Sequence, residues 1–401
     1  MSLARLAWVY LWSRPLATLL NLLLLGLALA AMSFLLLVGG QVDERLRRDL
    51  AGIDLVVGAK GSPMQLILAG VYHLDVPPGN IPVSAIETLR GHPLVAQVVP
   101  LSLGDTYRGA RIVGTTPDYA GLYGARLAQG RMWQAPLEAV LGSEVARRHR
   151  LSSGDRFFGS HGLGAEGEVH GDHPYVVVGV LEPTGTVLDR VVLTSTESVW
   201  EVHEAATALD EADRLALAAE REVTMLLVRY RSPLAAVTLP RWVNAQEGLQ
   251  AAAPAVETAR LLAMVGIGVD VLRGFAAVLL AVAGLSVFIA LHHAVRERIG
   301  DLAMWRMLGA GPRRVAGLVV FEALWLAALG CVAGLALGHG LTALLGWWLD
   351  ARNSMTVTAW TWPAAQWSVP ALALGLALVS AALPAWRAYR VDVTRLLQAP
   401  R

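Results

Sequence analysis

The sequence contains little that could carry redox, metal or nucleotide chemistry. It has one cysteine, Cys331, which excludes a disulfide within the chain and any site built from several cysteines. It has one lysine, Lys60, which lies between Ala59 and Gly61. A nucleotide-binding P-loop needs Gly-Lys-Ser/Thr, because its lysine must reach the β- and γ-phosphates. The chain itself therefore cannot be a P-loop ATPase, and no spacing of residues in it predicts another enzymatic activity.

Charged residues are also scarce. They make up 16% of the 401 residues, whereas 55% are hydrophobic; a typical soluble domain has about 25% charged residues. The formal net charge of +1 gives no electrostatic support for a nucleic-acid partner. This composition is too apolar for a wholly soluble protein and too charged for one that lies entirely within a membrane.

The apolar residues concentrate in four segments. A bilayer core of roughly 30 Å needs about 20 helical residues, and Leu16–Val38 contains no charged residue over 23 positions. We predict a membrane protein with four transmembrane helices and a large mixed α/β extracytoplasmic domain between the first and second. The predicted segments are an amphipathic N-terminal helix (1–15), spans at 16–38, 269–293, 315–348 and 369–386, the extracytoplasmic domain with helical stalks (39–268), a cytoplasmic coupling helix and loop (294–314), an extracytoplasmic loop (349–368) and a cytoplasmic tail (387–401).

Arginine and tryptophan orient these spans. The loop between the third and fourth spans contains one arginine, Arg352, and is flanked by five tryptophans, whereas the other span ends are rich in arginine. Lysine and arginine are enriched in cytoplasmic loops, and tryptophan is enriched at membrane interfaces. We therefore expect a multi-pass membrane protein with both termini in the cytoplasm. A competing interpretation of the N-terminus is a signal peptide cleaved near Ala28-Leu29-Ala30, although its apolar stretch exceeds the usual 7–15 residues.

Short β-branched runs between turn residues predict the strands of the extracytoplasmic domain. Helices are expected between them, including 84–91, 142–150, 196–222 and 240–262. The expected strands are Ile53–Val57, Val95–Val99, Arg111–Val113, Ala139–Leu141, Tyr175–Leu181, Val191–Leu193 and Met225–Tyr230.

The segment between the second and third spans reads VRERIGDLAMWRMLGAGPRRVAGLVVFE over residues 295–322. It predicts a short helix, Glu297–Leu308, ended by Gly309 and followed by a Gly311-Pro312 turn. Glu322 lies within the third predicted span, and we expect it to pair with Arg313 or Arg314. Such a helix between two spans could pass a push from a cytoplasmic partner into the membrane; a solvated charged loop is the simpler interpretation.

DLAMWRMLGA (301–310) resembles the E-I-A-x-L-R-A-L-G-A motif of MacB/FtsX-like ABC transporter permeases, and the chain also resembles LolC/LolE-type permeases. The ending PAWRAYRVDVTRLL (384–397) resembles the family's C-terminal motif, with Val393 in place of a proline. The order of one span, a large extracytoplasmic domain and three further spans is also that of the family.

The resemblance implies a permease subunit of the inner membrane that transmits mechanical work. Two permease copies, as a homodimer, would pair with a separate cytoplasmic P-loop ATPase, which would use ATP and Mg²⁺; this chain would bind no cofactor itself. A periplasmic adaptor or binding protein could also take part. The residues expected to couple to the ATPase are Glu297, Arg298, Asp301, Arg306, Leu308, Gly309 and Ala310.

Two further segments are weaker candidates. The apolar piece within residues 56–82 could contact a substrate or partner, or it could simply be core; its candidate residues are Lys60, Met64, Leu66, Ile67, Leu68 and Tyr72. The loop 161–175 contains imidazole and carboxylate groups, so His161, His170 and His173 are weak zinc candidates in what is more simply a polar surface loop.

Three functions remain open on the sequence. The chain could be an ABC permease that drives export or extraction of an amphipathic substrate such as a lipoprotein, lipid, peptide or toxin. It could be an FtsX-like signalling scaffold that controls a periplasmic partner without transport. It could also be a membrane-anchored binding module without an ATPase, in which case replacing Arg306 or Gly309 would change nothing.

Overall fold

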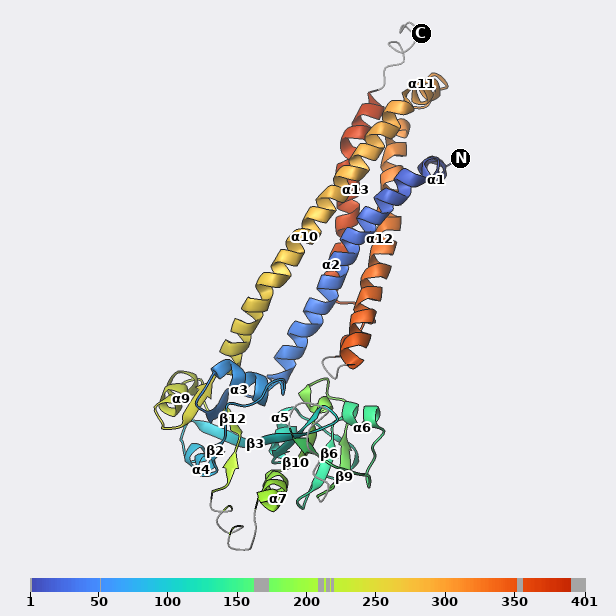
Figure 1. The fold of residues 1–401 in the computed structure, drawn as a ribbon. Coiled ribbons are helices and arrows are strands. Elements are labelled where there is room, and N and C mark those ends of the chain that lie inside the picture. Colours follow the sequence, from blue (N-terminus) through green and yellow to red (C-terminus); the bar gives the residue numbers. More distant parts are fainter. Residues whose placement is uncertain are drawn as a thin grey trace. The chain divides into compact units, whose positions relative to one another are not determined.

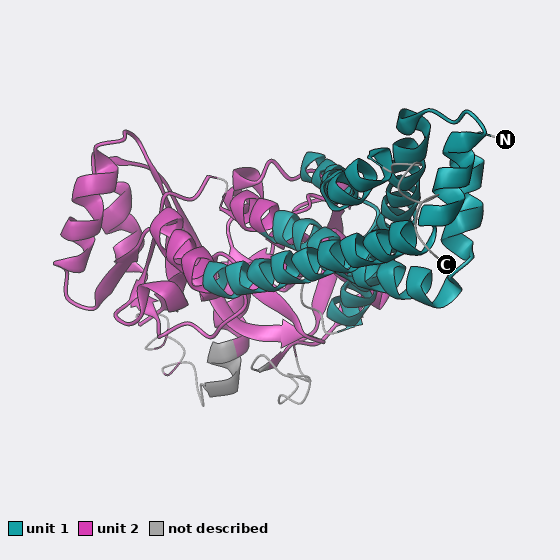
Figure 2. Cartoon of the chain, turned by 90° about the horizontal axis from the view of Figure 1, so that it is seen from above, with its two compact units in different colours: residues 1–42, 265–401 teal, residues 43–264 magenta. Residues whose placement is uncertain are grey.

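The computed structural model describes residues 2–50, 52–161, 173–207, 213, 217, 220–351 and 356–390. The chain divides into two compact units, coloured separately in Figure 2. Unit 1 comprises Met1–Val42 and Val265–Arg401, and unit 2 comprises Asp43–Met264. The predicted extracytoplasmic region, residues 39–268, encloses unit 2.

Unit 1 is built from helices (Figure 1). Four helical segments, Pro15–Asp49, Pro254–Glu297, Pro312–Ala351 and Ala364–Tyr389, are long and apolar enough to cross a membrane, which confirms the four predicted spans. At 1.5 Å per residue, the 35 residues of α2 and the 44 of α10 extend roughly 50 and 65 Å, well beyond a bilayer core. The helices of this unit are α1 (Leu3–Trp12), α2 (Pro15–Asp49), α10 (Pro254–Glu297), α11 (Ile299–Met307), α12 (Pro312–Ala351), the 3-10 helix η2 (Ala364–Trp367) and α13 (Ser368–Tyr389).

A row of glycines on α12 lets that helix approach α2 very closely. Gly330, Gly334 and Gly338 recur every four residues, so they share one face of the helix. A Cβ atom placed on Gly334 would lie 2.6 Å from the Cβ of Leu29, and one on Gly338 would lie 2.6 Å from the Oγ of Ser33. Small residues at this spacing allow membrane helices to pack backbone against backbone. We call these three residues the glycine row.

Unit 2 is organised around an eleven-stranded sheet among the described residues. Its main path runs β13-β1-β12-β3-β4-β10-β6-β9-β5, with β8 paired to β3 and β7 paired to β9. Most pairs are antiparallel, but β4–β10 and β6–β9 are parallel. The strands are β1 (Leu55–Ala59), β3 (Val95–Tyr107), β4 (Ala110–Thr115), β5 (Leu127–Gly130), β6 (Glu138–Leu141), β7 (Arg156–Phe157), β8 (Ser160–His161), β9 (Tyr175–Leu181), β10 (Val192–Ser195), β12 (Met225–Tyr230) and β13 (Leu249–Ala252), with β2 (Ile81–Pro82) and β11 (Glu222–Val223) forming a separate pair.

Helices pack on this sheet and divide its core into two clusters. One cluster lies around β1, β12 and α4, and the other around β4, β6 and β9. The apolar runs in the sequence form strands that are covered on both faces. In β1, for example, the three residues Leu55–Val57 are each 0% exposed. The helices of unit 2 are α3 (Pro63–Gly70), α4 (Ser84–Arg90), α5 (Asp118–Leu122), α6 (Ser143–His149), η1 (Val187–Arg190), α7 (Thr196–Thr207) and α9 (Ala235–Asn244).

Three predicted helices differ from the structure. The expected helix over 240–262 is wrong: α9 ends at Asn244, strand β13 follows, and α10 begins at Pro254. The expected helix over 196–222 is confirmed over α7, Thr196–Thr207, but Glu222 lies in β11; most of the residues between them lie outside the described part of the chain. The expected helix Glu297–Leu308 begins later, since α10 continues through Glu297 and α11 begins at Ile299.

Candidate functional site

Helix α11 presents an apolar surface at one end of unit 1. Leu302 and Ala303 are buried against the helical unit. Met304 and Met307, in contrast, are 50% and 54% exposed, and Leu308 just after the helix is 82% exposed. An exposed apolar group of this kind, beside the exposed carboxylate of Asp301, has the character of a surface that binds another protein.

The turn after α11 depends on a glycine. Gly309 has a φ of +95°, a conformation that other L-residues rarely adopt. Its N–H donates to the carbonyl oxygen of Arg306 at 3.1 Å, and Ala310 N–H donates to that of Trp305 at 2.9 Å. Pro312 then begins α12, where a proline costs no helical hydrogen bond. The chain therefore passes from α11 to α12 through the four residues 308–311.

A buried ion pair fixes the residue that precedes α11. Arg298 Nη1 donates to Glu322 Oε1 at 2.8 Å, and their side chains are 14% and 6% exposed. Arg298 Nη2 donates to the carbonyl oxygen of Tyr10 at 3.1 Å and to Ser13 Oγ at 3.0 Å. The guanidinium also lies 4.2 Å from the centroid of the Tyr10 ring. These four residues, which we call the Arg298 cluster, join α1, α10 and α12 at the base of α11.

The expected partner of Glu322 is therefore wrong. The sequence favours Arg313 or Arg314, but both of these residues are exposed at the start of α12, and Glu322 pairs with Arg298. Eight or nine residues along one helix correspond to roughly 12–14 Å, which is too far for an ion pair. Arg298 reaches Glu322 from the end of α10 instead.

Aromatic contacts hold α1 against the same end. Trp325 Nε1 of α12 donates to the carbonyl oxygen of Ala4 at 3.0 Å, and its ring packs edge-on against that of Trp8 with centroids 5.0 Å apart. The Tyr10 ring lies 6.3 Å from that of Trp305 on α11. Helix α1 is thus a structural part of the region around α11.

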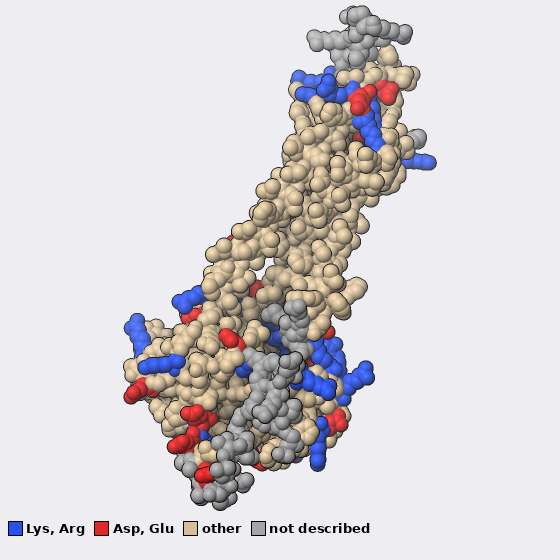
Figure 3. Space-filling model, viewed as in Figure 1, with Lys and Arg blue, Asp and Glu red and all other residues tan. Residues whose placement is uncertain are grey.

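Charged residues are concentrated at this end of unit 1. In Figure 3 the middle of the helical unit is almost free of charged side chains, and blue and red groups gather at the end that holds α1 and α11. Glu297 forms an ion pair with Arg14, and Arg387 near the end of α13 contacts His292 at 3.0 Å. The arginine-rich segments predicted to share one side of the membrane therefore lie at one end of the helical unit.

The predicted coupling residues occupy this end, but they do not form one surface. Arg298 is half-buried in its cluster, Arg306 and Ala310 are half-buried, and Glu297, Asp301, Leu308 and Gly309 are exposed. Binding of these residues to an ATPase stays a prediction. Sequence reasoning missed Met304 and Met307, which could have been found as apolar residues on the face of α11 opposite Leu302.

Buried hydrogen bonds in unit 2 connect the last residue of α2 and the first turns of α10 to the sheet domain. Val187 N–H donates to Asp49 Oδ1 at 2.7 Å, and Tyr123 donates its hydroxyl to the carbonyl oxygen of Asp49 at 2.9 Å. The hydroxyls of Tyr72 and Thr258 are 2.9 Å apart. We call these five residues the stalk junction.

A histidine next to Tyr72 adds a second buried contact. His73 Nε2 lies 2.9 Å from the hydroxyl of Tyr119, whose ring packs edge-on against that of Tyr123. Burial, followed by the charges of Arg111 and Arg190, lowers the pKa of His73 to about 3, so its imidazole is neutral at physiological pH. These contacts extend the network of buried side chains around the stalk junction.

The apolar segment 56–82 is largely core. Leu66 and Ile67 are 0% exposed and Tyr72 is 3% exposed, so these three candidate contact residues present no surface to a partner in this structure. Lys60 is exposed, and Met64 and Leu68 are half-buried. The burial arises because α3 lies against β1 and β13, where a Cβ atom on Gly58 would lie 2.5 Å from the Leu66 side chain.

The zinc candidates lie mainly outside the described residues. This applies to His170 and to the side chain of His161, whereas His173 is described and half-buried. Within the described part of the chain, no group of three His, Cys, Asp or Glu side chains could hold a metal ion.

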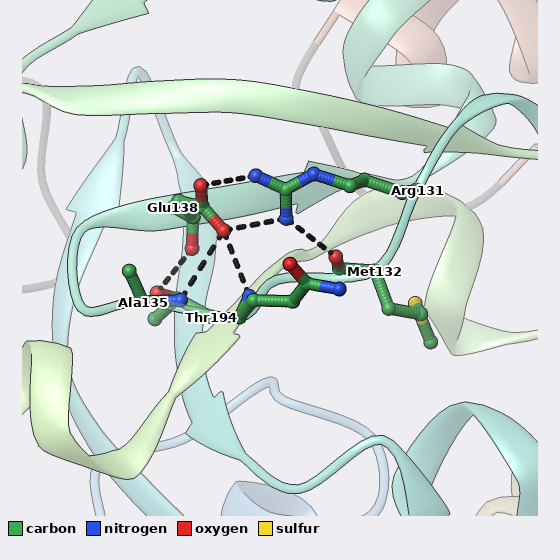
Figure 4. A network of polar contacts seen from close by, with 6 residues as sticks. Arg131, Met132, Ala135, Glu138 and Thr194 are labelled. Atoms are coloured by element: carbon green, nitrogen blue, oxygen red, sulfur yellow. Dashed lines mark hydrogen bonds and ion pairs between the residues drawn. The ribbon is translucent and has the colours of Figure 1, made fainter.

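A separate polar network, shown in Figure 4, has a structural role. Glu138 on β6 binds Arg131 through both carboxylate oxygens and accepts the N–H of Gln134 at 2.7 Å and of Ala135 at 3.3 Å. These hydrogen bonds, first of all that from Arg131, lower the pKa of Glu138 to about 2. The carboxylate thus fixes the loop between β5 and β6 rather than acting on a ligand.

Comparison with known families identifies both units. Residues 18–239 match the MacB-like periplasmic core domain, and residues 273–393 match the FtsX-like permease C-terminal domain. The chain belongs to the MacB/FtsX-like permease family. This permease is a membrane protein, and at the level of its family it is an ABC transporter permease. Members of the family work with ATPase partners in ABC systems.

Two solved structures are similar to part of this permease. The periplasmic region of MacB from Actinobacillus actinomycetemcomitans is 13% identical, with a TM-score of 0.35, and the match covers 53% of this chain and 95% of that one. The extracellular domain of the noncanonic ABC-type transporter YknZ from Gram-positive bacteria is 15% identical, with a TM-score of 0.31, covering 50% and 98%. No curated protein matches the chain.

Proposed function

We propose that this chain is the permease subunit of an ABC transporter in which α11 docks onto a separate cytoplasmic ATPase. The exposed apolar side chains of Met304, Met307 and Leu308 carry this proposal. A surface of this kind would suit a hydrophobic groove on a partner. The Arg298 cluster holds the base of α11, so a force applied there would reach α1, α10 and α12 together.

Orientation in the membrane is part of the proposal. The end of unit 1 that holds α11 is rich in arginine, including Arg14, Arg298 and Arg387. Arginine-rich ends of membrane helices usually face the cytoplasm. We infer an inner-membrane location with both termini in the cytoplasm and unit 2 outside it. The nucleotide and its Mg²⁺ would bind the ATPase, and a second permease copy would complete the complex.

Movement of unit 2 would be the output of the transporter. Asp49 belongs to α2 and Thr258 to α10, and both are hydrogen-bonded within the stalk junction. Rotation or tilt of either helix would therefore act directly on the sheet domain. Work of this kind would drive export or extraction of an amphipathic substrate such as a lipoprotein, lipid, peptide or toxin, with a periplasmic adaptor or binding protein as a further partner.

The test is purification of the tagged full chain with its co-expressed ATPase. Leu308→Asp places a charge in the proposed interface at a position where the side chain makes little contact with its own chain. Leu234→Asp is the matched control, since Leu234 is 63% exposed in unit 2. We expect the ATPase to co-purify with the wild type and with Leu234→Asp, and to be lost from Leu308→Asp.

Equal recovery of the ATPase with both variants would refute docking through α11. If docking holds, the stimulus of ATPase activity separates two functions. Stimulation by an amphiphile in vesicles supports transport, whereas stimulation only by a periplasmic protein supports an FtsX-like signalling scaffold.

A further inference from the structure

A cavity of about 530 Å³ lies between the second half of α12 and the loop that precedes η2. Its volume is within the range of small-molecule sites. It stays open because a glycine faces it: a Cβ atom placed on Gly340 would meet no described atom within 4 Å. The described lining contains no Asp, Glu, Lys or Arg. Its residues are Leu335, Ala336, His339, Gly340 and Ala343 of α12, and Ala359, Trp360, Thr361 and Trp362 of the loop.

Hydrogen bonds hold this loop in place, so the shape of the cavity does not depend on a ligand. The side-chain amide of Gln41 on α2 donates to the carbonyl oxygen of Thr358 and accepts the N–H of the same residue, each at 2.9 Å. His339 Nδ1 donates to the carbonyl oxygen of Ala359 at 2.6 Å. The imidazole also stacks on the Trp362 ring, with centroids 5.5 Å apart. Both α2 and α12 therefore fix the loop.

The lining offers few polar atoms to a ligand. Nδ1 of His339 is engaged by Ala359, and Nε2 of Gln366 lies 3.4 Å from the other ring nitrogen, to which it can donate. The remaining lining residues of α12 are a leucine, two alanines and a glycine, which have no polar side-chain atom. Ordered water needs two to four polar partners, and apolar cavities take up apolar molecules instead. The cavity therefore suits hydrocarbon better than water or a polar ligand.

Tryptophans place the cavity just inside the membrane interface. Trp347 and Trp348, one turn beyond the cavity on α12, are 70% and 43% exposed, and Trp360 is 96% exposed. Tryptophan is enriched at membrane–water interfaces, where its ring lies at the headgroup level. The lining residues 335–343 precede Trp347 by four to twelve positions, roughly 6–18 Å along the helix. The parts of lipid acyl chains nearest the headgroups lie at this depth.

We propose that this cavity binds one acyl chain of a membrane lipid. The chain would lie along Leu335 and Gly340, beneath the indole rings of Trp360 and Trp362, and its headgroup would remain outside. Fixed walls on several sides give a chain more van der Waals contact than mobile neighbouring lipids do. Because the described lining has no Asp, Glu, Lys or Arg to bind a headgroup, the site would recognise the chain alone. Binding does not require that α11 docks onto an ATPase.

The experiment is photolabelling of the purified full chain in detergent micelles, titrated with phosphatidylcholine that carries a diazirine in one acyl chain. Labelled peptides are identified by mass spectrometry. We expect labelling of residues 335–343 and 359–362 to saturate at one lipid per chain. Labelling of the lipid-exposed face of α10, for instance at Phe275, which is 66% exposed, should instead rise without saturation.

Gly340→Leu fills the cavity from a position where the added side chain has space. It should lower labelling of residues 335–343 and 359–362 at least fivefold and leave labelling at Phe275 unchanged. Gly375→Leu is the matched control, because Gly375 is an exposed glycine of α13 with equally open space that does not line the cavity. Labelling that does not saturate, or equal labelling of the two variants, would overturn the proposal.

Folding is checked by the Tm of each variant in detergent without added lipid. The Tm of Gly340→Leu should equal or exceed that of the wild type, because leucine favours a helix more than glycine does. Phosphatidylcholine should then raise the Tm of the wild type and of Gly375→Leu, but not that of Gly340→Leu. Ala336→Leu fills the same cavity from a second exposed position and should also abolish the rise. A rise in both filling variants would contradict binding at this site.

The part of the lipid that is recognised is tested with phosphatidylglycerol carrying the same diazirine chain. It should label residues 335–343 and 359–362 within twofold of phosphatidylcholine, since only the headgroup differs. A preference of tenfold or more for either headgroup would show that the site binds a headgroup and would overturn recognition through the chain.

Discussion

The Arg298–Glu322 pair offers a test of how the base of α11 is held. Arg298→Met removes the cation while keeping an apolar stem, and it leaves the carboxylate of Glu322, 6% exposed, without its partner. Removing one member of a buried pair costs about 3–5 kcal/mol. Replacing both members with apolar residues of similar volume is often close to neutral. We therefore expect Arg298→Met/Glu322→Leu to recover most of the stability lost in Arg298→Met.

The assay is reversible unfolding of the purified full chain in mixed micelles, followed through the free energy of unfolding for the wild type, both single variants and the double variant. Arg273→Met is the control on α10, the helix that ends just before Arg298, because the Arg273–Asp270 pair is 55% and 72% exposed. Exposed pairs contribute about 0–1 kcal/mol. A double variant as unstable as Arg298→Met, or a loss no larger than that of Arg273→Met, would show that the pair does not stabilise this region.

Three further outcomes are expected. Gly309 has open space around its Cβ position, so substitutions there should act through backbone strain of about 1–2 kcal/mol. The ATPase activity of the assembled complex should therefore fall in the order Gly, Asn, Ala, Val at this position. An order that follows side-chain size alone, with Asn below Ala, would contradict this. Tyr72→Phe removes the hydroxyl that contacts Thr258 in the stalk junction. The substrate or periplasmic partner should then stimulate ATPase activity less than in the wild type, while the amount of ATPase that co-purifies with the chain stays unchanged. A loss of co-purified ATPase would point to misfolding instead. The pKa of Glu138 is lowered from 4.5 to about 2, so its carboxylate stabilises the fold above about pH 4.5, and this contribution is lost as the pH falls towards 2. The Tm difference between the wild type and Glu138→Gln should therefore shrink over that interval. A constant difference would show that the ionised carboxylate does not stabilise the loop.

Local hydropathy was sufficient to predict the four spans. A membrane helix must satisfy its own backbone and present apolar side chains along its whole length, so Leu16–Val38 is recognisable without knowledge of its neighbours. The same is true of buried strands such as β9, where a run of valines lies between turn residues. The left-handed turn at Gly309 was also predictable, because glycine takes that conformation at little cost.

Features that depend on distant partners could not be predicted in this way. Residues Leu249–Ala252 contain two alanines and form β13 only because β1 offers an unpaired edge. Glu322 pairs with Arg298 because α10 ends beside it, and sequence proximity favoured the wrong arginines. Burial of Leu66 and Ile67 depends on how α3 lies against the sheet, so an apolar segment could not be assigned to surface or core from its composition.

The glycine row limits the motions that this permease can make. Where the backbones of α2 and α12 touch, the helices cannot slide past one another by a residue without first separating, because Leu29 and Ser33 lie directly against Gly334 and Gly338. We therefore expect α2 and α12 to move together as one rigid pair where they are in contact. A displacement of α12 would then carry with it the part of α2 that contacts the glycine row, around Leu29 and Ser33.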